Sequence, residues 1–201
     1  MAVPALLHNT KNKVFFLQVG ASDGLTNDPL NPMINKYSSQ IEGICIEPLS
    51  NVFKKLVSNY SAYSGIKCEN SALTDCDDEI FMYSPVSEDG SQKTSLKLDV
   101  LNGHGFSEIE KIKVSGISLS SLVKKYEITD IDILQVDVEG YDYQVIRMVL
   151  DFGFSPSIIH FESLHLNKDE MAASRAMLSE NGYLCIETSK DTLAVKKHLT
   201  F

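Results

Sequence analysis

The chain has 201 residues, of which 43% are hydrophobic and 22% charged. This composition is typical of globular proteins and excludes wholesale disorder, and the length predicts one domain over residues 1–201, with residues 1–12 as a short N-terminal extension. The formal net charge of −9 disfavours a surface that binds nucleic acid. No apolar run approaches the ~20 residues that span a bilayer, so we expect a soluble, cytoplasmic protein with no membrane partner.

Four cysteines are scattered along the chain, at Cys45, Cys68, Cys76 and Cys185. They form no Cys-x-x-Cys pair, and no histidine stands at the spacing of a zinc ligand. We therefore predict reduced thiols in a reducing compartment rather than a disulfide framework or a zinc site.

The first 60 residues predict two strands, each followed by a turn or loop and a helix. An apolar run that starts near Val14 is typical of a strand covered on both faces, as in parallel sheets. Asn31 and Ser50 stand where helix-capping residues are expected. In chain order we expect a strand over 14–19, a turn over 20–28, a short helix from 31, a strand over 43–47 and a helix over 50–60.

The rest of the chain continues this alternation, after one irregular stretch. Residues 84–111 are rich in Ser, Asp, Gly and Lys and predict a long loop, which in a compact domain is usually functional or mobile. Ser118 and Asn167 are expected to cap helices. The other elements expected are a strand over 66–73, an extended piece over 79–83, a helix after 118, a strand over 131–138, a helix over 141–149, a strand over 157–162, a helix over 167–181, and strands over 183–187 and 192–196.

Strands that alternate with helices predict an α/β fold with a mostly parallel sheet and helices on both faces. In such sheets, ligands bind beyond the carboxyl ends of the strands. The ends of the predicted strands are therefore where candidate site residues are sought.

A glycine-containing turn and an acidic residue follow the first two strands. Residues 20–24 read Gly-Ala-Ser-Asp-Gly, which permits a tight turn but breaks the Gly-x-Gly-x-x-Gly pattern of dinucleotide-binding proteins. Glu47 follows Gly24 by roughly 23 residues, close to the ~20-residue offset at which an acidic group binds ribose hydroxyls. Glu47 together with the glycine turn predicts a ligand that contains a nucleoside. The broken glycine pattern disfavours a nicotinamide cofactor.

Further acidic residues follow two later strands. Strand alternation directs Asp137 and Glu139 to the same side near the top of the sheet, and Glu162 ends the next strand, with His165 three residues later. Carboxylates that converge in this way favour a cationic ligand. A sulfonium group is one such cation.

Four motifs occur in order between about Val14 and Glu162. They read Gly-Ala-Ser-Asp-Gly at 20–24, Ile-Glu-Pro at 46–48, Asn-Ser-Ala-Leu at 70–73 and Ile-Leu-Gln-Val-Asp-Val-Glu-Gly-Tyr at 133–141. Together they resemble the FkbM family of S-adenosylmethionine-dependent methyltransferases, most specifically through Asp-Val-Glu-Gly-Tyr. The resemblance implies the three-layer, Rossmann-like class I methyltransferase fold, with a seven-stranded, mostly parallel sheet whose last strand is antiparallel. It also implies methylation of a hydroxyl on a sugar or a polyketide-like metabolite.

The resemblance also implies roles for individual residues in cofactor binding and in catalysis. The residues that would contact the cofactor are Gly20, Ala21 and Gly24 at its methionine part, Glu47 at its ribose, Ser71 and Ala72 at its adenine, and Asp137 at its amino group or the reacting centre, with Asp23 and Pro48 also in the cofactor-binding set. Glu162 and His165 would lie on the acceptor side. Residues 84–111 have no counterpart in the four motifs. We interpret them as a loop that covers the acceptor, with His104 at its tip, or alternatively as a disordered surface loop.

Transfer of a methyl group to an alcohol needs a group that removes or acidifies the hydroxyl proton. We predict His165 as the general base, with Glu162 and Asp137 beside it, and assign no metal ligand. In an alternative mechanism, Asp137, Glu162 and His165 bind a divalent cation such as Mg²⁺ or Mn²⁺.

Other functions remain open at this point. The chain could be a catalytically inactive cofactor-binding module in an assembly or, less in keeping with the glycine turn, a nicotinamide-dependent oxidoreductase. Methylation of nucleic-acid amino groups is disfavoured because the strand expected over 131–138 is not followed by an Asn/Asp-Pro-Pro-Tyr/Phe motif. Few residues precede the first strand, so a second copy of the chain in a homo-oligomer could complete the site.

Overall fold

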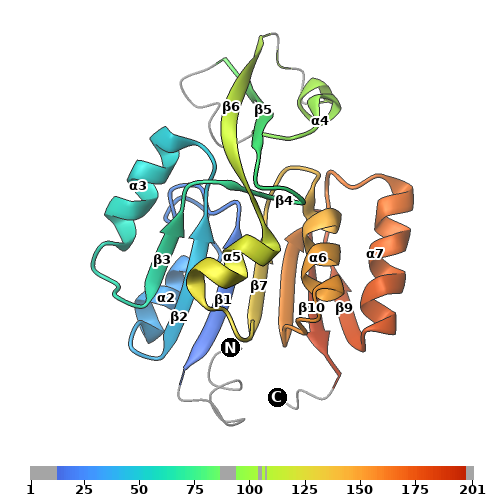
Figure 1. Cartoon of the computed structure of the whole chain (residues 1–201). Coiled ribbons are helices and arrows are strands. Elements are labelled where there is room, and N and C mark those ends of the chain that lie inside the picture. Colours follow the sequence, from blue (N-terminus) through green and yellow to red (C-terminus); the bar gives the residue numbers. More distant parts are fainter. Residues whose placement is uncertain (1–12, 87–93, 104–105, 107, 198–201) are drawn as a thin grey trace.

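A central sheet of seven strands organises the protein (Figure 1). The computed structural model describes residues 13–86, 94–103, 106 and 108–197. The strands are β1 (Val14–Val19), β2 (Ile41–Ile46), β3 (Ile66–Glu69), β7 (Ile133–Val136), β8 (Ile158–Glu162), β9 (Tyr183–Glu187) and β10 (Asp191–Lys196), in the order β3-β2-β1-β7-β8-β10-β9. Paired strands from β3 to β8 are parallel, whereas β10 is antiparallel to both β8 and β9. The prediction of a mostly parallel, seven-stranded sheet whose last strand is antiparallel is confirmed.

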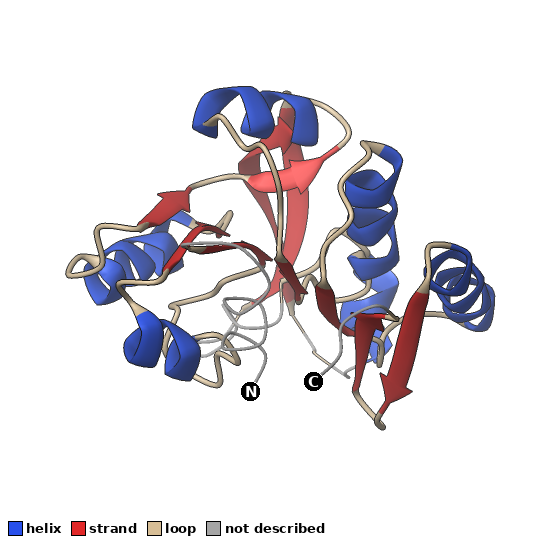
Figure 2. Cartoon of the chain, turned by 90° about the horizontal axis from the view of Figure 1, so that it is seen from below, coloured by secondary structure: helices blue, strands red, loops and turns tan. Residues whose placement is uncertain are grey.

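Helices cover both faces of this sheet and make a three-layer structure (Figure 2). They are α2 (Asn31–Tyr37) and α3 (Ser50–Tyr60) on one face, and α5 (Leu119–Tyr126), α6 (Asp142–Asp151) and α7 (Lys168–Glu180) on the other. Side chains alternate along β1, so that Phe16 packs with Leu56 of α3 while Leu17 packs with Leu122 of α5. Each of these side chains is fully buried and contributes about 1.5–3 kcal/mol to folding.

A second, three-stranded sheet rises from the carboxyl edge of the central sheet (Figure 1). It consists of β4 (Ala72–Thr74), β6 (Ile109–Ser118) and β5 (Glu79–Pro85), in the order β4-β6-β5, and α4 (Leu98–Gly103) lies beside it. We call β5 and β6 the arm. Met82 and Val114 of the arm pack with Leu49 and Val52 in a small core of their own, so the arm is fixed to the body near α3.

The structure corrects two predictions in this region. The strand expected over 66–73 is two strands, because β3 pairs with β2 in the central sheet whereas β4 pairs with β6. The loop expected over 84–111 contains the end of β5, all of α4 and the start of β6. The polar side chains of β6 alternate with apolar ones, and one face of this strand meets water, so its composition resembles that of a loop.

Two of the four predicted helix caps are confirmed. Ser118 and Asn167 accept hydrogen bonds from the first turns of α5 and α7, and Asn167 forms a capping box with Glu170. Asn31 and Ser50 do not cap, because α2 and α3 begin at these residues. Their side chains bind elsewhere, to the carbonyl oxygen of Gly24 and to the Asn70 side chain.

Some expectations concern residues that lie outside the described part of the chain, namely the extension over 1–12 and His104. The four cysteines are free; Cys45 is buried, Cys68 and Cys76 are half-buried, and Cys185 is exposed. Among the helices that the structure describes, none combines the length and the apolar character needed to cross a bilayer.

Candidate functional site

Glu47, directly after β2, is buried at the carboxyl edge of the sheet. Its Oε2 accepts a hydrogen bond from the backbone N–H of Ser22 (3.0 Å), and its Oε1 accepts one from the N–H of Leu49 (2.8 Å). Burial raises the pKa of the Glu47 carboxyl to about 7, although both hydrogen bonds favour the ionised form. A carboxylate has about four lone-pair sites, so two remain for hydroxyl groups of a ligand.

The glycine turn meets Glu47 because Gly20 allows two strand ends to approach closely. A Cβ atom at Gly20 would lie 1.9 Å from the carbonyl oxygen of Asp137, and the φ of Gly20 is +81°. The N–H groups of Gly20 and Ala21 both donate to the carbonyl oxygen of Ile46. The turn therefore joins the ends of β1, β2 and β7 at one place, and the glycine is required by contact within the chain itself.

One cavity opens where these strand ends meet. Its lining residues come from the glycine turn, the β2 end, the arm and the turn after β7: Gly20, Ser22, Thr26, Asn27, Glu47, Pro48, Met82, Thr94, Asp137, Val138 and Glu139. Four residues that the sequence assigned to the cofactor, Gly20, Glu47, Pro48 and Asp137, thus share one cavity.

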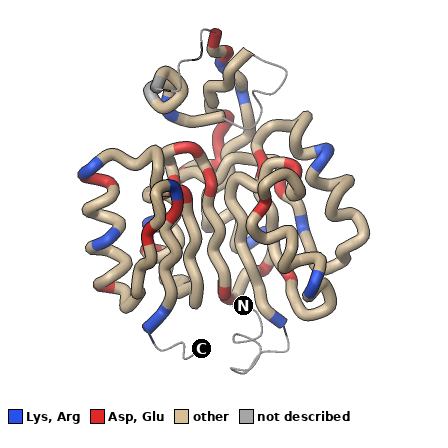
Figure 3. The backbone as a smooth tube through the Cα atoms, turned by 180° about the vertical axis from the view of Figure 1, so that it is seen from behind, with Lys and Arg blue, Asp and Glu red and all other residues tan. Residues whose placement is uncertain are grey.

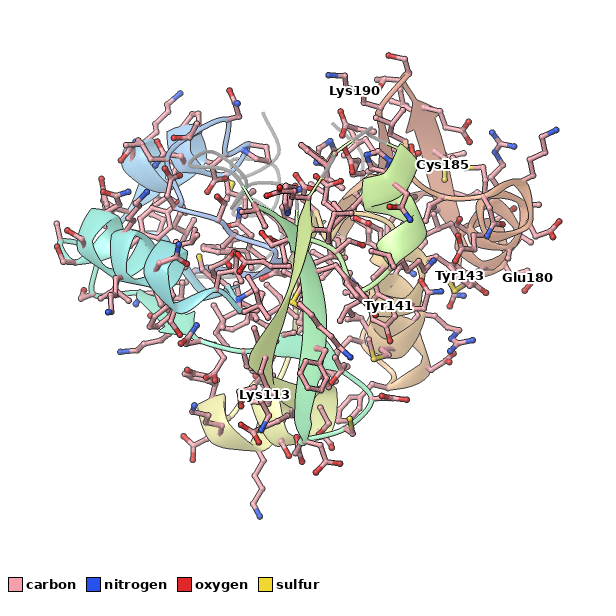
Figure 4. The ribbon with its side chains drawn as sticks, turned by 90° about the horizontal axis from the view of Figure 1, so that it is seen from above. Lys113, Tyr141, Tyr143, Glu180, Cys185 and Lys190 are labelled. Carbon is pink, nitrogen blue, oxygen red and sulfur yellow. The ribbon has the colours of Figure 1, made fainter. Side chains whose placement is uncertain are left out.

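A narrow apolar slot lies next to this cavity and shares Gly20, Pro48, Met82 and Val138 with it. Its other lining residues are Val19, Ile46, Ser71, Ala72, Leu73, Leu96 and Tyr141. Viewed from above, Tyr141 lies between the arm and α6 (Figure 4). The slot holds Ser71 and Ala72, the two residues assigned to an adenine ring, in mostly apolar surroundings that suit a flat heterocycle.

Three residues of the glycine turn have roles within the chain. Asp23 accepts hydrogen bonds from the N–H groups of Leu25 and Thr26 and so orders the turn. Ala21 is buried in the core on the α3 side of the sheet, and a Cβ at Gly24 would collide with Leu56 and Tyr60. The linings of the cavity and of the slot include neither Ala21 nor Asp23 nor Gly24.

Asp137 stands directly after β7, on the cavity wall. The residue as a whole stays in contact with solvent, yet enough protein surrounds its carboxyl group to raise the pKa to about 6, with smaller contributions from Asp191 and Asp28. The ionised form would be favoured by a cation in the cavity.

Glu139, Glu162 and His165 gather beyond Asp137, and we call these three residues the acid–histidine cluster. The Nε2 atom of His165 lies 3.3 Å from Oε2 of Glu139 and 3.6 Å from Oε2 of Glu162. The three side chains are only 12–17% exposed. Asp137, which the sequence placed with Glu162 and His165, is not part of this group of ligand atoms. The cluster borders the cavity because Glu139 lines it.

Several carboxyl groups lie close together around the cluster. Burial first, and then the carboxylates of Asp137 and Glu139, raise the pKa of Glu162 to about 8. Asp142, at the start of α6, is also buried, and burial followed by the Asp137 charge raises its pKa to about 8. Acidic segments lie along the sheet edge below the arm (Figure 3), so a cation is the ligand that this edge favours.

The segment between the arm and α4 is tied to the cluster. Ser95, which is fully buried, donates a hydrogen bond from Oγ to the carbonyl oxygen of Glu139 (2.7 Å) and pairs through its backbone with Tyr83 of β5. Lys97 forms an ion pair with Glu170 of α7 (2.7 Å). The arm, the turn after β7 and α7 are therefore connected around the cluster.

Sequence reasoning placed Glu139 among the acidic residues at the sheet edge but assigned it no catalytic or cofactor-binding role. Asp137 and Glu139 both line the cavity, although β7 ends at Val136 and Glu139 adopts a left-handed φ of +46°. The cavity residues Met82, in the arm, and Thr94, between β5 and α4, were missed because the fold of this region was not predicted. The three-residue spacing of Glu162 and His165 was the feature of the sequence that indicated the cluster.

The fold is shared with solved methyltransferases of low sequence identity. A precorrin-6y C5,15-methyltransferase from Geobacter metallireducens superposes with a TM-score of 0.50 and 10% identity, over 98% of this chain and 87% of that one. A protein from Thermoplasma acidophilum, provisionally assigned as a methyltransferase, superposes with a TM-score of 0.51 and 12% identity, over 96% of this chain and 72% of that one. The CurJ carbon methyltransferase superposes with a TM-score of 0.50 and 12% identity, over 94% of this chain and 50% of that one.

A family model identifies the chain more specifically than these structures do. No curated protein matches the sequence significantly. The model of the methyltransferase FkbM domain, however, matches residues 18–185, a stretch that includes the glycine turn, Glu47, the cavity and the acid–histidine cluster. The protein therefore belongs to the FkbM family of S-adenosylmethionine-dependent methyltransferases.

Proposed function

We propose that this methyltransferase transfers the methyl group to a hydroxyl of a small metabolite, such as a sugar or a polyketide-like compound. One observation carries the proposal: Glu139 belongs both to the cavity and to the acid–histidine cluster. The place for the methyl donor is thus continuous with groups that accept a proton. An alcohol is a poor nucleophile near neutral pH and needs such groups.

The residues of the cavity fit S-adenosylmethionine part by part. Glu47 has lone pairs left for the two ribose hydroxyls, and charge-assisted hydrogen bonds of this kind contribute about 1.5–3 kcal/mol each. In this proposal the slot with Ser71 and Ala72 would receive the adenine, and the Asp137 carboxylate would face the positively charged end. When bound, the cofactor supplies a methyl group activated by its sulfonium.

The chain's own residues then have three tasks. The cavity walls align the acceptor oxygen with the methyl carbon and the sulfur, and they exclude water. S-adenosylmethionine, when bound, would supply the methyl group to the acceptor oxygen, and its sulfur would keep the electron pair of the carbon–sulfur bond that breaks. The hydroxyl proton passes to the acid–histidine cluster. His165 is the candidate for the base, and Glu139 orients the His165 imidazole.

The lining of the cavity supports a neutral, hydroxylated acceptor. Thr26, Asn27 and Thr94 present polar groups that can bind hydroxyls of such a molecule. The carboxylates of Asp137, Glu139 and Glu162 disfavour an anionic acceptor, and with a net charge of −9 they disfavour a nucleic acid in particular.

The proposal is tested by incubating the protein with S-adenosylmethionine and a panel of sugars and hydroxylated polyketides, and by mass spectrometry of the products. We expect a mass gain of one methyl group, on oxygen, in at least one compound. Tight cofactor binding without any methylated product would instead favour a cofactor-binding module. Methylation on carbon or nitrogen alone would contradict the assignment to a hydroxyl.

A further inference from the structure

Three potential metal ligands come together from separate segments of the chain. Glu139 lies in the turn after β7, Glu162 ends β8, and His165 lies in the turn before α7. Each offers one ligand atom, and these atoms all lie within 4.8 Å of one another. We propose that the acid–histidine cluster binds one divalent transition-metal ion, for which Mn²⁺ is the probe.

The two separations from His165 within the cluster are close to those between ligands around one ion. The two Nε2–Oε2 separations, 3.3 and 3.6 Å, exceed the roughly 2.7–2.9 Å of a direct charge-assisted hydrogen bond. Two ligand atoms that each lie about 2.1 Å from a shared ion, at tetrahedral or octahedral angles, are roughly 3.0–3.5 Å apart. Small side-chain movements would therefore place an ion among the three atoms.

A buried oxygen atom of Glu162 supplies an independent observation. Its Oε2 has almost no contact with solvent and has no hydrogen-bond partner in the described part of the chain. This oxygen is also the atom that approaches Nε2 of His165. A carboxylate oxygen buried without a partner is costly, and a cation at this point would provide the missing interaction.

The charge and the donor types agree with a transition-metal ion. The carboxylates of Asp137, Glu139, Asp142 and Asp191 act electrostatically on Glu162. Carboxylate oxygens suit Mg²⁺, Ca²⁺ and Mn²⁺, whereas an imidazole nitrogen suits first-row transition metals. A set with both donor types favours Mn²⁺ over Mg²⁺ or Ca²⁺.

The site would be open toward the cavity, since Glu139 lines it. Three protein ligands leave positions for water or a substrate oxygen. The role of the ion rests on the proposed function. The ion would lower the pKa of the acceptor hydroxyl, and the hydroxyl proton would pass to solvent. His165 would then act as a ligand and not as the base.

Binding is tested directly on the full chain after treatment with EDTA and removal of the chelator. Calorimetric titration with Mn²⁺, together with loss of the free Mn²⁺ signal in electron paramagnetic resonance, should show one ion per chain. Absence of binding by the wild-type protein would overturn the proposal, whatever the behaviour of any variant.

Variants then locate the ion. Glu162→Gln and His165→Ala should each weaken Mn²⁺ binding at least tenfold. Glu180→Gln, at the exposed C-terminal end of α7 (Figure 4), should leave binding unchanged and serves as the matched control. Equal Mn²⁺ affinity in all three variants would contradict the assignment. Thermal unfolding verifies folding, and Glu139→Gln replaces any variant that does not fold.

Two further measurements separate this inference from the proposed function. S-adenosylhomocysteine should bind with the same affinity in EDTA and in Mn²⁺, because Glu47 and the slot hold it. Mn²⁺ binding at the cluster without methylation of any hydroxyl would leave the metal site standing and overturn the proposed function. Undiminished hydroxyl methylation in EDTA would support the proposed function, with His165 as the base, and overturn the role of the ion.

Discussion

The Glu47 carboxylate accepts a hydrogen bond from the backbone N–H of Ser22 over 3.0 Å. This contact connects the end of β2 to the glycine turn after β1, and it fixes the orientation of the carboxylate at the cavity wall. A side chain that is held in this way before a ligand arrives loses little entropy on binding. The geometry of Glu47 is therefore central to the cofactor site.

Replacement of Glu47 should weaken cofactor binding. We expect Glu47→Ala to raise the dissociation constant for S-adenosylmethionine by about 10- to 150-fold, the equivalent of the ~1.5–3 kcal/mol of a charge-assisted hydrogen bond. The matched control is Glu42→Ala on the same strand, whose exposed side chain pairs with Lys13. Calorimetry on both variants tests the assignment, and an unchanged constant in Glu47→Ala would refute it.

Cofactor binding should also depend on pH through Glu47. Ribose hydroxyls donate to the ionised carboxylate, and burial raises the pKa of this group to about 7 in the free protein. Affinity should therefore rise with pH up to about 7 and then level off, with up to roughly tenfold weaker binding at pH 6 than at pH 8.

The same titrations on Glu47→Gln separate this effect from titration of the ligand itself. This variant cannot ionise at position 47, so its affinity should not show the rise through pH 7. A rise of equal size in the variant and the wild type would assign the pH dependence to another group.

Gly20 should be far more sensitive to substitution than another glycine with positive φ. Gly20→Ala would place a Cβ 1.9 Å from the Asp137 carbonyl oxygen, and we expect it to lower the free energy of unfolding by about 2–5 kcal/mol. Gly153 has a φ of +102° with no atom within 4 Å of a Cβ, so Gly153→Ala should cost only about 1–2 kcal/mol. Urea denaturation measures both, and equal losses would argue against the close approach of β1 and β7.

Ser95 should matter for the position of Glu139. Ser95→Ala removes the buried hydrogen bond to the Glu139 carbonyl oxygen and should lower the free energy of unfolding by about 1–3 kcal/mol. Turnover should fall, while cofactor affinity stays nearly constant. Ser61→Ala, which removes the exposed bond to the Ser58 carbonyl oxygen, is the control. Similar losses of stability and turnover in the two variants would exclude a positioning role.

The central sheet could be predicted from the sequence because its strands are buried on both faces. The apolar run at Val14–Val19 has a burial pattern that is nearly continuous, and such runs are characteristic of parallel sheets. The arm could not be predicted in the same way. Strand β6 has few buried positions, and its partners β4 and β5 lie more than 20 residues before it in the chain, so its pairing depends on tertiary contacts.

The candidate site was predictable where it depends on strand ends and less so where it depends on turns. Glu47 and Asp137 directly follow β2 and β7, and both line the cavity. The position of the Glu139 side chain depends on the left-handed backbone of this residue, because the alternation of side chains between the two faces of the sheet ends with β7. The sequence also placed Gly24 at the ligand, whereas its contacts are with the side chains of α3.

The central claim is that the cavity between Gly20, Glu47 and Asp137 holds the methyl donor. A crystal structure with S-adenosylhomocysteine tests it most directly. We expect the ribose hydroxyls within hydrogen-bonding distance of the Glu47 carboxylate, the adenine in the slot beside Ala72, and the sulfur on the side of the acid–histidine cluster. Density for the ligand elsewhere on the protein, with this cavity empty, would contradict the account.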